Sequence, residues 1–201
     1  MTFKPDHSAL STQHSALSSL GVTAAQGYQA ATAEAGLKSS GFDLFLLQSQ
    51  TPAVAAGVFT RNQILGAPVR ISAEHLASAT TRAIITNSGN ANCCTGEDGL
   101  KKARQMCQIT AEKVGCSPEE VLVCSTGIIG VPLPLEKIAT KVPSMKWDSG
   151  AEVDLQAAQA IMTTDLVPKY FSASIKIDEK IVTLGGMVKG SGMIGPDMGA
   201  M

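Results

Sequence analysis

The sequence predicts a mixed α/β protein, with sheets and helices packed around common cores. Short apolar runs of strand length recur along the chain, and a long amphipathic stretch lies between two of them. Two further runs near the end are separated by two polar residues. Strand, helix and strand in succession, followed by a hairpin, are typical of a mixed architecture.

Four short apolar runs predict buried strands. Each has four to six residues, a length typical of strands rather than helices. The runs cover residues 42–47, 54–59, 82–86 and 121–124.

The segment from Gly96 to Gly115 predicts an amphipathic helix. Apolar and small residues recur there at steps of three and four, whereas most of its charged residues lie outside that stripe. Gly115 is a candidate for the left-handed residue that ends the helix. Two further helices are expected, one after Pro134 and one over residues 151–161.

The last clear pattern is an antiparallel hairpin. Residues 172–177 and 180–188 have strand composition, and only Asp178 and Glu179 separate them. Two-residue connections of this kind are typical of hairpins.

Net charge and hydrophobicity limit the kinds of partner that the protein can bind. The net charge is −1, so the chain lacks the basic surface expected of a protein that binds nucleic acid or anionic membranes. No apolar run reaches the roughly 18 residues of a membrane span. We therefore expect small-molecule partners.

Five cysteines without CxxC spacing favour reduced, buried thiols and a cytoplasmic location. The alternative, a zinc site, requires regular ligand spacing, whereas Cys93 and Cys94 are adjacent and the remaining gaps are wide. We expect no metal.

Two regions are distinguished along the chain. Residues 1–20 contain the near-repeat His-Ser-Ala-Leu-Ser and predict a flexible Ser-rich tail, whereas residues 21–201 form the folded part. The chain stops within an apolar, glycine-rich segment at 189–201, which we interpret as a processing site or a truncation.

Two loops follow predicted strands and are candidates for chemistry. The amides and backbone N–H groups of residues 87–92 either bind a carboxylate or serve as turn and helix-capping groups, which the spacing favours. In the segment 125–130, Thr126 and Gly127 form either an oxyanion hole or a tight turn.

Several segments in order carry a resemblance to one enzyme family. They are Ala-Ala-Gly-Val-Phe-Thr-Arg-Asn at 55–62, Asn-Ser-Gly-Asn-Ala-Asn at 87–92, Ser-Thr-Gly-Ile-Ile-Gly at 125–130, Ile-Met-Thr-Thr-Asp at 161–165 and Lys-Gly-Ser-Gly-Met-Ile at 189–194. With these motifs the chain resembles the α chain of ornithine acetyltransferase, the bifunctional glutamate N-acetyltransferase (ArgJ) family of arginine biosynthesis.

The resemblance implies a precursor that cleaves itself before a threonine. The α chain then pairs with a β chain, in a heterotetramer of two α and two β chains. The new terminal threonine takes acetyl from N2-acetyl-L-ornithine and passes it to L-glutamate in a ping-pong cycle. No cofactor is implied, although acetyl-CoA is a possible second donor. The implied fold is a four-layer αββα sandwich of the DmpA/ArgJ-like type, related to the N-terminal-nucleophile hydrolases.

The resemblance also assigns site residues. Thr126 and Gly127 match the oxyanion-hole pair, and Thr163 and Lys189 match residues that contact substrate, with Thr164 as the alternative to Thr163. Ala200 occupies the position of the nucleophilic threonine.

Three hypotheses about function remain, and Ala200 separates the first two. The chain belongs to an active acetyltransferase whose cleavage junction is shifted, or to an inactive or uncleaved relative that still binds the substrates. A related self-processing aminopeptidase or amidohydrolase is the third.

Overall fold

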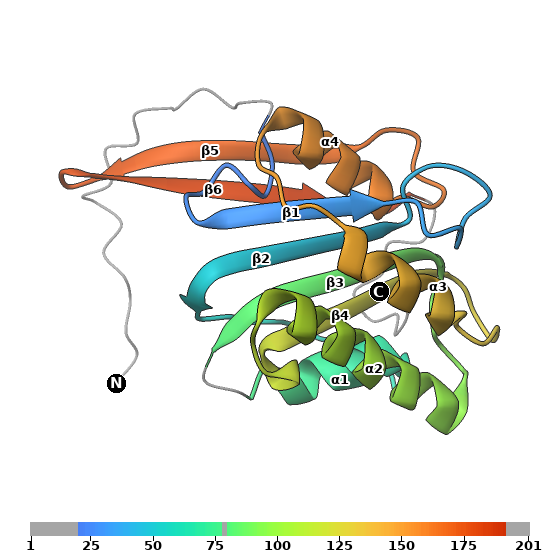
Figure 1. Cartoon of the computed structure of the whole chain (residues 1–201). Helices are drawn as coiled ribbons and strands as arrows, with labels where there is room; N and C mark the ends of the chain where they lie inside the picture. The colour runs from blue at the N-terminus through green and yellow to red at the C-terminus, as the bar shows by residue number, and fades with distance from the viewer. Residues whose placement is uncertain (1–19, 78–79, 192–201) are drawn as a thin grey trace.

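The computed structural model describes residues 20–77 and 80–191; all but the last residue of the expected tail at 1–20, and Ala200, lie outside these residues. Its main element is a four-stranded sheet of order β1-β2-β3-β4. The strands are β1 (Tyr28–Ala33), β2 (Leu44–Ala53), β3 (Thr81–Asn90) and β4 (Val121–Ile128). Strand β2 is antiparallel to both β1 and β3, whereas β3 and β4 are parallel (Figure 1).

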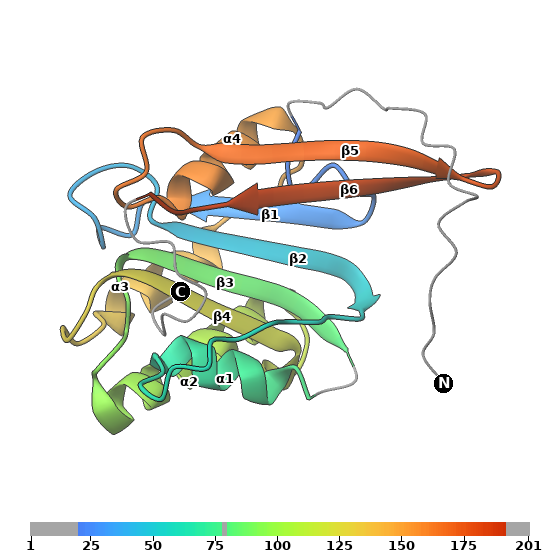
Figure 2. The same ribbon diagram turned by 180° about the vertical axis from the view of Figure 1, so that it is seen from behind.

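The remaining elements are helices and one hairpin. The α-helices are α1 (Ala67–His75), α2 (Gly96–Val114), α3 (Leu135–Lys141) and α4 (Ala151–Ala160). Short 3₁₀ turns are η1 (Pro118–Glu120) and η2 (Val142–Ser144). Strands β5 (Lys169–Ile177) and β6 (Lys180–Val188) form the hairpin, which lies near α4 in both views (Figure 2). Within the described residues no helix is long and apolar enough to cross a membrane.

Two hydrophobic cores lie on opposite faces of the sheet. Ala31 and Leu46 belong to the larger core, whereas their neighbours Ala30 and Phe45 belong to the smaller one. Successive residues of a strand point to opposite faces, so the two cores are separated by the sheet. The larger core includes residues of α1, α2 and α3, and the smaller one includes residues of α4.

Side chains of α1 form hydrogen bonds with backbone groups at the free edge of β4. Ser72 donates to the Val123 carbonyl at 2.7 Å and accepts its N–H at 2.9 Å, and His75 Nδ1 lies 2.7 Å from the Val121 carbonyl. Because a carbonyl only accepts, His75 carries its proton on Nδ1. These bonds protect an edge strand that would otherwise present unpaired backbone groups.

Most of the predicted elements are confirmed. The helix at 96–115 ends at Gly115 with φ 76°, and the hairpin turns at Asp178 and Glu179. The strand predicted over residues 54–59 is wrong, because this segment is irregular and its Val58 side chain is fully exposed. An apolar run forms a strand only where a neighbouring strand is available to pair with it.

The expectation of buried thiols is correct for only part of the set. Cys93 and Cys107 are buried and Cys116 is half-buried, but Cys94 and Cys124 are exposed. All five are free.

Shortening a buried side chain of the larger core should lower the free energy of unfolding. Ile85 is 0% exposed in the larger core, so Ile85→Ala is expected to lower the free energy of unfolding by about 2–5 kcal/mol. Ile181 is 76% exposed, and Ile181→Ala should cost less than about 1 kcal/mol. Urea unfolding of both variants measures the difference, and equal losses would contradict this assignment of the core.

Candidate active site

The end of β4 lies directly against the end of β3. Gly127 is paired with Gly89, and both have positive φ, 137° and 101°. A Cβ atom on Gly127 would lie 2.3 Å from the Gly89 carbonyl carbon and 2.5 Å from the Asn90 nitrogen. Glycine is therefore required for this close approach, which places Thr126 and Gly127 beside the end of β3.

The asparagine-rich segment at 87–92 is structural. Asn87 donates to the Asn90 carbonyl at 2.9 Å and accepts from the Ser125 hydroxyl at 2.6 Å. Asn92 donates to the Gly99 carbonyl at 2.9 Å. These buried amides are engaged within the chain, which confirms the turn-making interpretation over a carboxylate site at these side chains. They also fix the strand end that carries Thr126.

A cavity of about 1020 Å³ opens beside these strand ends. It brings together the predicted residues Thr126, Gly127, Thr163, Thr164 and Lys189 from three separate parts of the chain. The remaining wall includes Glu34, Lys38 and Gln159 together with main-chain and apolar groups, among them Gly89, Ile128 and Met162.

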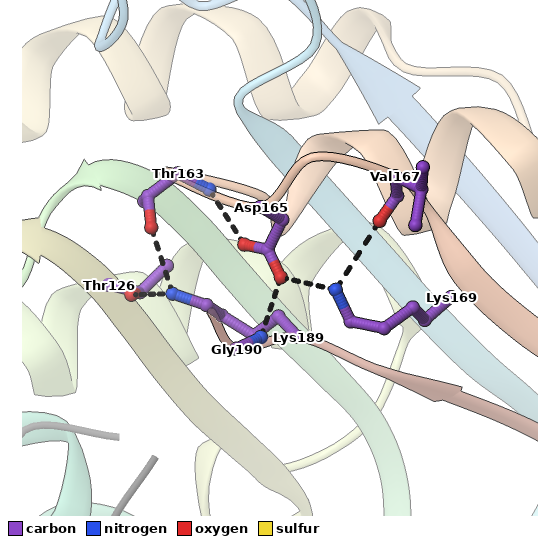
Figure 3. Close-up of polar contacts among 7 residues, drawn as sticks. All are labelled: Thr126, Thr163, Asp165, Val167, Lys169, Lys189 and Gly190. Atoms are coloured by element: carbon purple, nitrogen blue, oxygen red, sulfur yellow. Dashed lines mark hydrogen bonds and ion pairs between the residues drawn. The ribbon is translucent and has the colours of Figure 1, made fainter. Parts of the chain in front are cut away.

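Lys189 is the centre of the polar contacts in this cavity (Figure 3). Its ammonium donates to Thr126 Oγ1 at 2.8 Å and to Thr163 Oγ1 at 3.0 Å. Since the lysine occupies an acceptor site on each oxygen, each hydroxyl keeps its own hydrogen for another acceptor. The pair of hydroxyls and one cation can therefore bind an oxygen atom that carries negative charge.

Asp165 supports Lys189 from outside the cavity wall. Its Oδ1 accepts from Gly190 N at 2.6 Å and from Lys169 Nζ at 2.7 Å, and its Oδ2 accepts from Thr163 N at 3.2 Å. Burial alone would raise the pKa of this carboxyl, but these three donors outweigh it and lower the pKa to about 2. Asp165 is therefore an anion at neutral pH.

Burial lowers the pKa of Lys189, while the nearby Asp165 charge opposes that effect and Lys169 adds to it. The negative charge of Asp165 thus favours the charged form of Lys189.

The sequence pattern gives no role to Asp165, Lys38 or Glu34. These residues are identified only by their position in the structure, at or beside the cavity.

Lys189 bonds to Thr163 and not to the alternative Thr164. Among residues 20–77 and 80–191, no group of three or more His, Cys, Asp or Glu side chains is placed to hold a metal ion.

Two glycine variants test the strand contact. Gly127→Ala should cost about 1–3 kcal/mol more in free energy of unfolding than Gly130→Ala. Both residues have positive φ, but nothing lies within 4 Å of a Cβ atom built on Gly130. Thermal or urea unfolding measures both, and an equal cost would show that β3 and β4 separate easily at this point.

The free energy of unfolding should depend on pH through Asp165. A lowered pKa means that the stabilisation is complete above the ordinary value of 3.8 and is lost as the pH falls to about 2. The stability gap between the native protein and Asp165→Asn should therefore shrink from pH 5 to pH 2. Asp178→Asn, at the exposed hairpin turn, is the control. A gap that stays constant over this range would contradict the assignment.

The chain matches a family model described as the ArgJ family over residues 29–201. Arginine biosynthesis bifunctional protein ArgJ from Thermosynechococcus vestitus is 49% identical over 90% of this chain and 44% of its own length. The protein of the same name from Geobacter sulfurreducens is 44% identical over 88% of this chain and 45% of its own. The chain thus spans a little under half the length of these relatives.

Solved structures give the same family and fold. The crystal structure of ArgJ from Bacillus halodurans has 35% identity and a TM-score of 0.86, covering 90% of this chain and 97% of the other. Ornithine acetyltransferase complexed with ornithine from Mycobacterium tuberculosis has 40% identity and a TM-score of 0.84, covering 90% and 98%. The expected ArgJ-like fold, related to the N-terminal-nucleophile hydrolases, is confirmed, and the chain belongs to the ArgJ family of arginine biosynthesis.

Proposed function

We propose that this chain is the α chain of an ornithine acetyltransferase that moves acetyl from N2-acetyl-L-ornithine to L-glutamate. The observation that carries the proposal is the Lys189 ammonium between the Thr126 and Thr163 hydroxyls in one cavity. The relative from Mycobacterium tuberculosis is complexed with ornithine, an amino acid whose carboxylate is a natural partner for Lys189.

The reaction uses a nucleophile supplied by the partner β chain. A terminal threonine hydroxyl gives its proton to its own α-amine and attacks the acetyl carbon. The carbonyl oxygen becomes an oxyanion, which the Thr126 hydroxyl and the Gly127 backbone stabilise, with the charge of Lys189 nearby. The ornithine amine leaves with a proton. Glutamate's amine then attacks the acetyl ester, which restores the hydroxyl.

The hairpin provides the surface for the β chain. On one face Phe171, Ile177, Val182, Leu184 and Val188 are exposed, and alternation along the two paired strands places them together. Exposed apolar patches of this kind are typical of protein interfaces. We place the β chain there, in a cytoplasmic heterotetramer of two α and two β chains that needs no cofactor, with acetyl-CoA as a possible second donor.

Ala200 favours a second candidate. Alanine has no hydroxyl, so if Ala200 stands at the position of the family nucleophile, the protein is an inactive or uncleaved relative that still binds acetylornithine or glutamate. If the protein is active, the cleavage junction is shifted and a threonine or serine begins the β chain.

Intact-mass measurement of the complete gene product distinguishes the two. Two chains, the second starting with threonine or serine, support the active enzyme, and one uncleaved chain supports the inactive relative. Ala200→Thr should then restore cleavage and transfer. Release of acetyl to water instead of glutamate would identify a hydrolase.

Lys189 provides the kinetic prediction. In the active form, or in the Ala200→Thr background, Lys189→Met should lower kcat/KM about 10²–10³-fold, because the variant loses both the partner of the substrate carboxylate and a positive charge near the oxyanion. Lys176→Met is the matched control, because Lys176 pairs with Glu179 at the exposed end of the same hairpin. Equal rates for the two variants would exclude Lys189 from the reaction.

A further inference from the structure

Asp165 joins two segments that are distant in sequence. It lies between α4 and β5, and its side chain is 0% exposed. One oxygen accepts the N–H of Gly190, just after β6, and the other accepts the N–H of Thr163. Figure 3 shows this carboxylate beside the contacts of Lys189.

The two backbone donors belong to the segments that carry the active-site side chains. Gly190 follows Lys189 directly, and Thr163 is itself a partner of the Lys189 ammonium at 3.0 Å. Gly190 has φ 142°, a backbone conformation that residues other than glycine rarely adopt. The turn after β6 is therefore held by one carboxylate, and the direction in which Lys189 leaves the strand depends on it.

The third donor has a different role. Lys169 Nζ lies 2.7 Å from Asp165 Oδ1 and is about one third exposed. It neutralises the buried carboxylate without contacting Thr126 or Thr163. The positioning of the two segments thus depends on the backbone bonds, and the ammonium of Lys169 offsets the cost of burying a charge.

Charges face Lys189 from several elements. Asp165 and Lys169 act from the α4–β5 connection and β5. Lys38 and Glu34 line the same cavity from the segment after β1, with the Lys38 ammonium 3.3 Å from the Met162 carbonyl. Among residues 20–77 and 80–191, Asp165 is the one buried carboxylate bonded to the segment that carries Lys189.

We propose that Asp165 is a positioning residue of the acetyl-transfer site. Its carboxylate locks the Thr163 loop to the turn after β6, so that the Thr163 hydroxyl and the Lys189 ammonium meet and bind the substrate carboxylate together. This inference rests on the proposed function for the identity of the substrate.

The test compares Asp165→Asn with Asp165→Glu, Lys169→Met and the control Asp178→Asn, all in the complete protein that carries out transfer. Asparagine has the same shape but must present an amide N–H₂ to one set of donors. We expect Asp165→Asn to lower kcat/KM about 10- to 100-fold, mainly through a higher KM. Lys169→Met should lose less, because both backbone donors remain, and Asp165→Glu should recover part of the loss. Asp178→Asn should match the native protein.

The pH profile separates positioning from simple loss of stability. Without the carboxylate, Lys189 loses a neighbouring negative charge and gives up its proton at lower pH. L-Ornithine binding, measured by calorimetry, should weaken as the pH rises and Lys189 loses its proton. In Asp165→Asn this weakening should begin at a lower pH than in the native protein. A variant that melts earlier but keeps the native KM and the native pH profile would overturn the proposal.

Failure of the proposed function gives a distinct result. If no acetyl transfer occurs even with Ala200→Thr, the proposed reaction is wrong. Lys189 is then followed by NMR titration of its ammonium in the same variants. An unchanged titration in Asp165→Asn would overturn the positioning role by itself.

Discussion

Three buried aspartates hold the irregular segments of this protein in place. Asp43 accepts the backbone N–H groups of Ala35, Leu37 and Lys38, and Asp154 accepts those of Gly21 and Thr23. Asp165 binds Thr163 and Gly190 in the same manner. A carboxylate out of water is tolerated only when donors satisfy it, so each aspartate forces its segment to supply N–H groups in a fixed arrangement.

Two of these arrangements form walls of the cavity. Asp43 shapes the segment after β1 that carries Lys38, and Asp165 shapes the wall that carries Thr163. The third wall, at the end of β4, is fixed by the glycine contact between β3 and β4. The site is thus preorganised by buried backbone hydrogen bonds and close packing, with its side chains held before a ligand arrives.

Local pattern predicted the elements whose partners are near in sequence. The helix α2 has one apolar stripe and a glycine at its end, and the hairpin is closed by two residues. The strand β1 was missed because three of its six residues are alanines, which are not enriched in strands, and pairing with β2 makes it a strand. Helix α1 was missed because its buried face includes the polar residues Ser72 and His75, which bond to the edge of β4, so an apolar stripe does not mark that face.

The sequence by itself determined the mixed α/β class, the long helix, the hairpin and, through its motifs, the resemblance to an acetyltransferase family. Thr126 was a candidate already because its loop follows a predicted strand, whereas Thr163 and Lys189 came from that resemblance, since nothing in their spacing indicates that they meet Thr126. Only the tertiary structure decided that one ammonium bonds to both threonines and that Asp165 holds the two segments together. The physical reason is that these contacts join residues 26 and 63 positions apart, and local periodicity carries no information over such separations.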